Sequence, residues 1–309
     1  MGQKDLAQSD YFNDKVRFAD ACNGILFQGK EIIRPEELQE TDAEMVYREE
    51  EKRRKIIPDI VRMWKGIYIA ILSVENQTKV DYKMIFRIMK AEAVNYERQW
   101  DEREKEYRRV GLLHEKAKLC WVGKDEKFIP VITIVIYYGT DKKWDGVTCL
   151  YDMLDMDKEL EPYISNYRMN LFDYHDCEDF SIFKTENRIL FEMLSCSQDK
   201  TAMRKLLEEK RNQYKNVDGA TIRTIFDIIG IKYSSKMRAK IEEEEDMCKA
   251  WDEMMEDERQ AGREKGISLA RTEDIRNIMD SLKVSALQAM SILKITETEK
   301  DKYISLLNR

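Results

Sequence analysis

Acidic residues stand at the ends of two neighbouring apolar segments. The segment Ile67–Leu72 is apolar at every position, and Glu75 follows it within three residues. Asp59 begins the preceding segment, and Lys65–Gly66 separates the two as a turn. A carboxylate at the rim of a buried strand loses its hydration unless a partner replaces it, and one divalent cation can serve both carboxylates. The spacing therefore predicts a metal site formed by Asp59 and Glu75.

The register of the two strands decides whether these carboxylates can meet. Opposed residues of an antiparallel pair share a face, so Asp59 opposite Leu72 would send the carboxylates to different sides of the sheet. A two-residue turn at Lys65–Gly66 gives that register. A three-residue loop, or a bulge near Pro58, would instead place Asp59 opposite Ser73. Pro58 cannot donate to a strand ladder and suits an edge or bulge, and we therefore predict an odd-numbered loop or a bulge.

The order of these residues resembles a known motif. Pro58–Asp59 followed by Glu75-x-Gln77 is similar to the motif of the PD-(D/E)xK nuclease superfamily. The similarity is greater to its Rpn-type branch of recombination-promoting nucleases and transposase-like proteins. The segments that carry it are FADACNGILFQGK (18–30), VENQT (74–78) with Arg87 in the helix that follows, and PVITIVIYYG (130–139) with Trp144. This resemblance implies an α/β fold with a restriction-endonuclease-like mixed sheet flanked by helices.

The resemblance also implies a chemistry. Asp59, Glu75 and the carbonyl oxygen of Asn76 would hold one or two Mg²⁺ ions, with Mn²⁺ as the alternative cation, because hard oxygen ligands suit both ions. The metal would activate a water molecule and stabilise the leaving oxygen, so no protein nucleophile is needed. The implied reaction is hydrolysis of phosphodiester bonds in DNA, linked to recombination or mobile elements.

The third motif position departs from the usual pattern. The superfamily motif usually ends in lysine, whereas this chain has Gln77. A glutamine side chain can hydrogen-bond the attacking water but carries no charge. Lys79, Lys83 or Arg87 would supply the missing cation, and Arg87 matches the pattern of the branch; an ordinary salt-bridged helix arginine is the alternative. Lys79 and Lys83 are also the candidate nucleic-acid contacts.

Asp20 lies on the first long helix predicted for the chain, Ser9–Phe27, one position from its apolar stripe. In the superfamily an acidic residue on this helix often completes the metal site. The resemblance therefore makes Asp20 a candidate metal ligand or ligand-orienting group, and a solvated helix aspartate is the alternative.

Composition limits the other classes of function. The net charge of −7 gives no overall basic field, so any nucleic-acid surface must be local. The six cysteines show no CxxC spacing, and with two histidines they argue against a zinc site. Unpatterned cysteines suit a reducing cytoplasm. The amino-terminal segment resembles no signal peptide, and no apolar run is long enough to span a membrane.

The periodicity of the chain predicts the elements that carry the site. A helix is expected from Tyr82 to Arg109, and a buried strand from Phe128 to Tyr138. A crossover of this kind places the buried strand parallel to the one that ends before Glu75. Trp144 and Asp145 are expected in a loop that reaches toward the site, before a short helix at 149–155 and an edge strand at 170–174.

The second half of the chain is predicted to be all-α. We expect a nuclease-like core at 1–180, a helical subdomain at 181–235, and a charged helical tail with a small helical bundle at 236–309. The charged helix is predicted at 238–271, with two or three short helices after it and Ser285 and Thr296 as helix N-caps. A DNA-binding helix-turn-helix is the alternative to the bundle, but its recognition helix would be poor in basic residues.

Two other functions fit the sequence. The protein could be a catalytically degenerate relative that binds nucleic acid through the same cleft, which weak Mg²⁺ binding with retained DNA binding would indicate. It could also be a helical protein-interaction module with the acidic stretch 242–258 as its working surface. The expected partners are DNA and a second copy of the chain that associates through the C-terminal helices, and no membrane.

Overall fold

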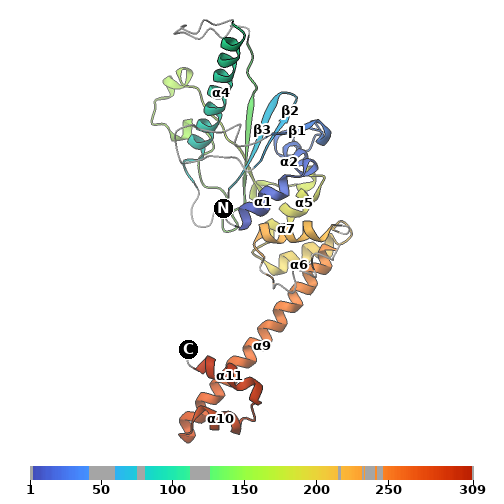
Figure 1. Cartoon of the computed structure of the whole chain (residues 1–309), viewed down its shortest axis with the longest axis vertical. Coiled ribbons are helices and arrows are strands. Elements are labelled where there is room, and N and C mark those ends of the chain that lie inside the picture. The colour runs from blue at the N-terminus through green and yellow to red at the C-terminus, as the bar shows by residue number, and fades with distance from the viewer. Residues whose placement is uncertain are drawn as a thin grey trace.

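The computed structural model describes residues 3–41, 60–74, 81–111, 126–214, 217–231, 233, 241 and 246–307. A mixed, open five-stranded sheet lies between helices, and further helices follow it toward the C-terminus (Figure 1). The predicted α/β fold class is therefore confirmed.

The sheet combines an antiparallel half and a parallel half. Its strands lie in sequence order: β1 (Leu38–Glu40), β2 (Ile60–Trp64), β3 (Ile67–Val74), β4 (Val131–Tyr137) and β5 (Asn170–Asp173). The first three pair antiparallel, whereas β3, β4 and β5 run parallel. The connection from β3 to β4 contains helix α4 (Met84–Arg109), as the crossover argument predicts. The predicted edge strand is also present as β5.

The turn between β2 and β3 corrects one expectation. Lys65 and Gly66 alone connect the strands, and the pairing runs from Trp64 opposite Ile67 to Ile60 opposite Ile71. Both turn residues have positive φ values, 47° and 75°, which is the backbone of a type I′ hairpin turn. The predicted odd-numbered loop is therefore wrong, because glycine at the second position allows the tighter turn. The predicted bulge near Pro58 lies outside the described residues.

Apolar side chains alternate between the two faces of the sheet, and each face packs against a different set of helices. Helices α1 (Gln3–Phe12), α2 (Lys15–Phe27), α5 (Glu186–Ser195) and α7 (Gly219–Ile229) share a core cluster with Ile71 and Ile134. Helix α4 covers the opposite face, where Ile88 packs with Leu72 and Val135. Each such buried aliphatic side chain contributes roughly 1.5–3 kcal/mol to folding. The sheet is thus fixed from both sides.

The predicted helix at Ser9–Phe27 is divided into α1 and α2. Asp14 separates the two helices because it is the N-cap of α2: its carboxylate accepts hydrogen bonds from the amides of Val16 and Arg17. The buried guanidinium of Arg62 on β2 donates to both the carbonyl and the side-chain oxygen of Asn13 at the break, at 2.8 and 2.6 Å. Burial lowers the pKa of Arg62. Asn13, at the break between α1 and α2, therefore supplies two oxygens to the buried guanidinium of Arg62.

Short 3₁₀ helices replace some predicted regular structure. They are η1 (Pro35–Glu37), η2 (Tyr151–Met153), η3 (Lys158–Tyr163), η4 (Tyr174–Asp176) and η5 (Phe180–Ile182). The helix predicted at 149–155 is reduced to η2, and Cys149 before it forms an isolated antiparallel bridge with Arg168. Helix α6 (Lys200–Glu209) precedes α7.

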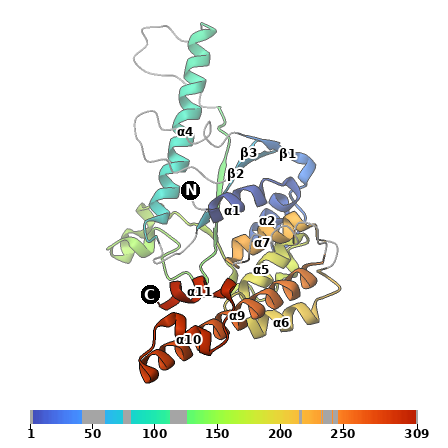
Figure 2. The same ribbon diagram turned by 60° about the horizontal axis from the view of Figure 1, so that its bottom comes forward.

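The C-terminal part is built on one long helix, α9 (Met247–Leu282), which leaves the body of the protein (Figure 1). It ends beside α10 (Ala286–Ile292) and α11 (Glu297–Leu307) (Figure 2). The first of the three predicted short helices is continuous with α9, which is a correction. Ser285 forms the predicted N-cap as part of a capping box, and Thr296 directly precedes α11 and donates to Glu299. Ile275, Met290 and Tyr303 form a separate small core there, as expected for a bundle.

The main core does not stop at the proposed domain boundaries. One cluster of buried residues extends from α1 and α2 through the sheet to α5, α6, α7 and the beginning of α9. The division at 180 and 235 remains a proposal.

Candidate active site

The predicted site falls only partly within the described residues. Asp59, Glu75, Asn76, Gln77 and Lys79 lie outside them, and Asp20, Lys83 and Arg87 lie within. The geometry of the site is therefore built from the strand ends and helices that border those positions.

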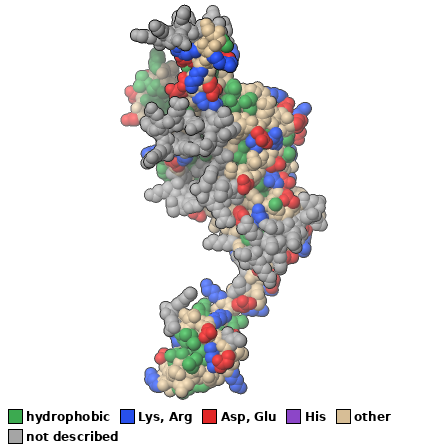
Figure 3. All heavy atoms as spheres, viewed as in Figure 1, with side chains coloured by type: hydrophobic (Ala, Val, Ile, Leu, Met, Phe, Trp, Pro, Cys, Tyr) green, Lys and Arg blue, Asp and Glu red, His purple; other side chains and the backbone are tan. Residues whose placement is uncertain are grey.

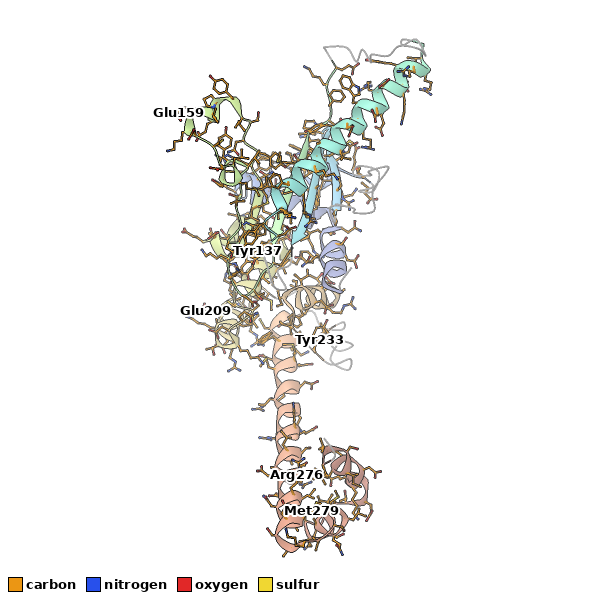
Figure 4. All side chains as sticks on the ribbon, turned by 90° about the vertical axis from the view of Figure 1, so that its left-hand side faces the viewer. Tyr137, Glu159, Glu209, Tyr233, Arg276 and Met279 are labelled. Carbon is orange, nitrogen blue, oxygen red and sulfur yellow. The ribbon has the colours of Figure 1, made fainter. Side chains whose placement is uncertain are left out.

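The parallel strands end together at one edge of the sheet. Val74, the last residue of β3, pairs with Tyr137 of β4, which pairs with Asp173 of β5. Glu75 follows Val74 directly in the sequence. Tyr137 lies within the body of the protein (Figure 4). In open α/β sheets, ligands bind outside the carboxyl ends of the strands, and this row marks that edge.

Asp20 is buried in α2 and accepts four hydrogen bonds from the start of α5. Its Oδ1 accepts from the Lys184 amide at 2.7 Å. Its Oδ2 accepts from the Thr185 amide and hydroxyl, at 3.2 and 2.6 Å, and from the Asn187 side chain at 3.0 Å. These contacts explain the burial of the carboxylate without a metal ion, because each oxygen has a donor. A metal-ligand role for Asp20 remains a prediction.

Arg87 is tied to the beginning of its own helix. Its Nη1 donates to Oδ2 of Asp81 at 2.7 Å, and Oδ1 of Asp81 accepts from the Lys83 amide at 3.0 Å. The Arg87 and Asp81 side chains are 39% and 36% exposed, so this pair contributes about 0–1 kcal/mol. The contact matches the salt-bridged alternative for Arg87. It also leaves the cation at a solvent-accessible position, 12 residues after Glu75 in the sequence (87 − 75).

Asp173 anchors the loop at the carboxyl edge, a role that the sequence analysis missed. Its Oδ2 accepts from the Trp144 amide at 2.7 Å. Its Oδ1 accepts from the His175 amide at 3.0 Å and lies 2.6 Å from Nδ1 of the same residue. The carboxylate side chain is 3% exposed. The Asp-x-His spacing at the end of an apolar strand was the available signal.

The loop after β4 is held through Asp145 and Trp144. Tyr82, just before α4, donates to Asp145 at 3.2 Å, and Lys142 forms an ion pair with the same carboxylate. Trp144 packs edge-to-face on Tyr137, with ring centroids 5.4 Å apart. The expected position of Trp144 and Asp145 in a loop at this edge is confirmed. Their contact with the predicted metal site is untested.

The hydroxyl groups of Tyr174 and Tyr137 hydrogen-bond to the loop at the same edge of the sheet. The Tyr174 hydroxyl donates to the Gly139 carbonyl at 2.6 Å, and burial raises the pKa of Tyr174 above its usual range. Tyr137 donates to the Lys142 carbonyl at 3.1 Å. Both phenols therefore act as neutral donors that fix the loop.

A family comparison assigns the chain. The model of the family described as "Putative transposase, YhgA-like" matches residues 60–218, just over half of the 309 residues. The chain belongs to this family. The YhgA-like family is part of the PD-(D/E)xK nuclease superfamily, in its Rpn-like branch, so the suspected resemblance is confirmed. No curated protein and no solved structure matches the chain.

Both limits of the YhgA-like match coincide with limits of secondary-structure elements. It begins at the first residue of β2 and ends at Asp218, the N-cap of α7. It therefore includes the Glu75 segment, α4 and the Asp173 anchor. The match leaves out α1, α2 and everything from α7 onward.

Two negative observations concern the described residues of this YhgA-like protein. Among them, no group of three or more His, Cys, Asp or Glu side chains is placed to hold a metal ion. None of the helices that the structure describes combines the length and the apolar character needed to cross a bilayer. On the face seen in Figure 3, basic and acidic side chains are interspersed.

Proposed function

We propose that this protein is a Mg²⁺-dependent DNA endonuclease that acts in recombination or in the movement of mobile elements. At the level of the family, a link to transposition is given by the YhgA-like match. The observation that supports cleavage is the position of the Glu75-x-Gln77 segment, which directly follows Val74 at the carboxyl edge of the parallel strands.

The proposed ligand set suits the proposed ion. Asp59, Glu75 and the Asn76 carbonyl offer only oxygen, which Mg²⁺ prefers and Mn²⁺ accepts. When bound, the metal supplies Lewis acidity and a water of lowered pKa. The chain contributes Gln77 to orient that water and Arg87, Lys79 or Lys83 to offset negative charge on the phosphate. Asp20 would act by holding α2 on α5, close to the same sheet.

Cleavage of supercoiled plasmid DNA tests this proposal. The wild-type protein should nick the plasmid with Mg²⁺ or Mn²⁺ and not with EDTA. Asp59→Ala and Glu75→Ala should each abolish nicking while circular dichroism and the thermal midpoint stay close to wild type. Absence of nicking by the wild-type protein with either ion would overturn the endonuclease proposal.

A non-catalytic relative that binds DNA is the second candidate, and the β2–β3 turn favours it. The two-residue turn leaves the convergence of Asp59 and Glu75 dependent on a bulge near Pro58. Retained binding of a fluorescent DNA duplex, with no Mg²⁺-dependent cleavage and unmeasurable Mg²⁺ affinity, would identify this function. DNA is the proposed partner for both the endonuclease and the non-catalytic relative.

A further inference from the structure

Two aromatic side chains are exposed at the start of α4, which lies over the sheet on the outside of the body (Figure 4). Tyr82 is 54% exposed in the turn before the helix, and Phe86 is 47% exposed in its first turn. Within the part of the chain that the structure describes, neither ring forms an aromatic pair or a cation–π contact. Trp100, farther along α4, differs because it stacks on Phe128. The two rings at the start of α4 therefore leave flat apolar faces open to a ligand.

Basic side chains flank Phe86. Residues three and four apart are neighbours on the surface of a helix, which places Lys83 and Lys90 beside the Phe86 ring. Both lysines are exposed. The stretch 82–91 contains no acidic residue. Tyr82, Lys83, Phe86 and Lys90 thus form one surface, which we call the aromatic–basic surface of α4.

The carboxylates that contact this part of the protein already have cationic partners. Asp81 accepts from Arg87, and Asp145 forms an ion pair with Lys142. The aromatic–basic surface therefore keeps a positive balance, which attracts an anionic partner. Asp145 also accepts a hydrogen bond from the Tyr82 hydroxyl. This contact joins the surface to the loop after β4, at the carboxyl edge of the sheet.

Aromatic faces between cations match the chemistry of single-stranded DNA. Unpaired bases stack on aromatic rings, and lysines bind the phosphates beside them. In a duplex the neighbouring base pairs cover the faces of each base, so exposed rings of this kind select DNA with unpaired bases. An acidic peptide would also match the charges. The contact with the loop at the carboxyl edge, where cleavage is proposed, favours DNA.

We propose that the aromatic–basic surface binds unpaired bases of the DNA substrate, with Phe86 as the main stacking ring. Tyr82, whose hydroxyl is held by Asp145, offers a second ring about one turn away. Lys83 and Lys90 bind the phosphates that flank the stacked base. The inference rests on the proposed function for DNA as the partner. It adds the class of substrate, which is DNA with a single-stranded stretch beside the site of cleavage.

Binding of a fluorescent single strand tests this proposal with the full-length protein, in EDTA to prevent cleavage. Anisotropy should show that the wild type binds an oligothymidine of about 16 nucleotides more tightly than a duplex of the same length. Phe86→Ala should raise the dissociation constant for the single strand at least about fivefold, because one stacked base is lost. Its affinity for the duplex should change by less than about twofold.

Two further variants at the same position separate stacking from a simple apolar contact. Phe86→Trp keeps a large aromatic face, so it should bind the single strand at least as tightly as the wild type. Phe86→Leu is apolar but has no aromatic face, so its affinity should be close to that of Phe86→Ala.

The lysines have a different signature, which depends on salt. Lys83→Ala with Lys90→Ala should weaken binding of the single strand and lower the slope of log K against log salt by about 1.4, as expected for two phosphate contacts. Tyr163→Ala is the matched control, because this tyrosine is exposed on η3 and does not belong to the aromatic–basic surface. It should bind both DNAs like the wild type. Thermal midpoints would establish that all variants are folded.

Failure of this proposal is distinct from failure of the endonuclease proposal. Binding of the single strand that depends on Phe86, without nicking in Mg²⁺, would support the surface and remove the enzyme. Nicking by a protein with equal affinities for single strand and duplex would support the enzyme and overturn the surface. Absence of DNA binding, or an unchanged affinity in Phe86→Ala, would also overturn it. So would a Phe86→Leu variant that binds like Phe86→Trp, because any apolar side chain would then suffice.

Discussion

Val74 and Asp173 lie in a single row across the sheet, because each pairs with Tyr137 on the strand between them. Asp173 ends β5 and is buried, and its carboxylate holds the loop that carries Trp144. Val74 ends β3, one residue before Glu75 in the sequence. The last described residue before the proposed catalytic segment therefore lies level with a polar anchor that fixes the neighbouring loop.

Loss of the Asp173 carboxylate should destabilise the protein and release this loop. Asp173→Ala would leave the half-buried amide of Trp144 without its acceptor and remove both contacts to His175. We expect a loss of about 2–3 kcal/mol in the free energy of unfolding by urea. Amide hydrogen exchange at Trp144 should also accelerate. Asp145→Ala is the matched control, because its exposed pair with Lys142 contributes little; an equal loss of stability in both variants would contradict the anchor.

Asp20 allows a direct comparison of helix capping with metal binding. Asp20→Ala should cost about 2–3 kcal/mol, because four donors at the start of α5 lose their acceptor. Asp20→Asn should cost less, since one side-chain oxygen remains. If capping is the whole role, titration calorimetry will give Mg²⁺ affinities for Asp20→Asn that equal the wild-type value. A large loss of affinity at unchanged stability would instead identify Asp20 as a ligand.

The sheet was predictable because its signals are local. The apolar runs at 67–72 and 131–137 and the helical pattern between them determine a parallel crossover. The turn between β2 and β3 was predicted incorrectly, because the odd-numbered loop was inferred from the proposed metal site. Such a loop would place the two carboxylates on one face of the sheet, whereas Gly66 itself favours a two-residue turn.

Other features depend on contacts between distant segments. Asp20 accepts hydrogen bonds from Lys184 and from Thr185, the N-cap of α5, so its environment could not be inferred from its own helix. The need for glycine at position 24 also comes from a distant segment, because a Cβ added there would lie 2.3 Å from a ring carbon of Phe183. Sequence periodicity identified the helix and its stripe, but it could not show that η5 and the start of α5 lie so close to α2.

Arg87 should matter for catalysis more than for stability if it supplies the missing motif cation. Arg87→Ala should lower the rate of plasmid nicking at least about tenfold, while the free energy of unfolding changes by less than about 1 kcal/mol. Arg87→Lys should restore part of the rate by restoring the charge. Asp81→Ala breaks the same ion pair and retains the cation, so it is the control. If both alanine variants nick DNA like the wild type, Arg87 serves only to hold the beginning of α4.

Glu192 should make the helical part of the core sensitive to acid. Its side chain is 3% exposed on α5 and accepts hydrogen bonds from Arg188 at 2.8 Å, from Lys210 and from Tyr214. Burial alone would raise the pKa of Glu192, but these donors outweigh it and hold the pKa below its ordinary value. The ionised carboxylate therefore stabilises the folded state above the unfolded pKa, and this contribution disappears as the pH falls through the lower, folded value.

The corresponding variant is Glu192→Gln. At neutral pH it should lose about 2 kcal/mol of stability, because Lys210 and Arg188 keep partial solvent access and do not become fully buried charges. As the pH falls through the lowered folded pKa of Glu192, the wild-type carboxylate also becomes neutral, so the difference between the two proteins should shrink. Urea unfolding at pH 7, 5 and 3.5 measures this trend. A difference that stays constant over that range would show that the shape of the side chain, and not its charge, holds α5 against the segment around Tyr214.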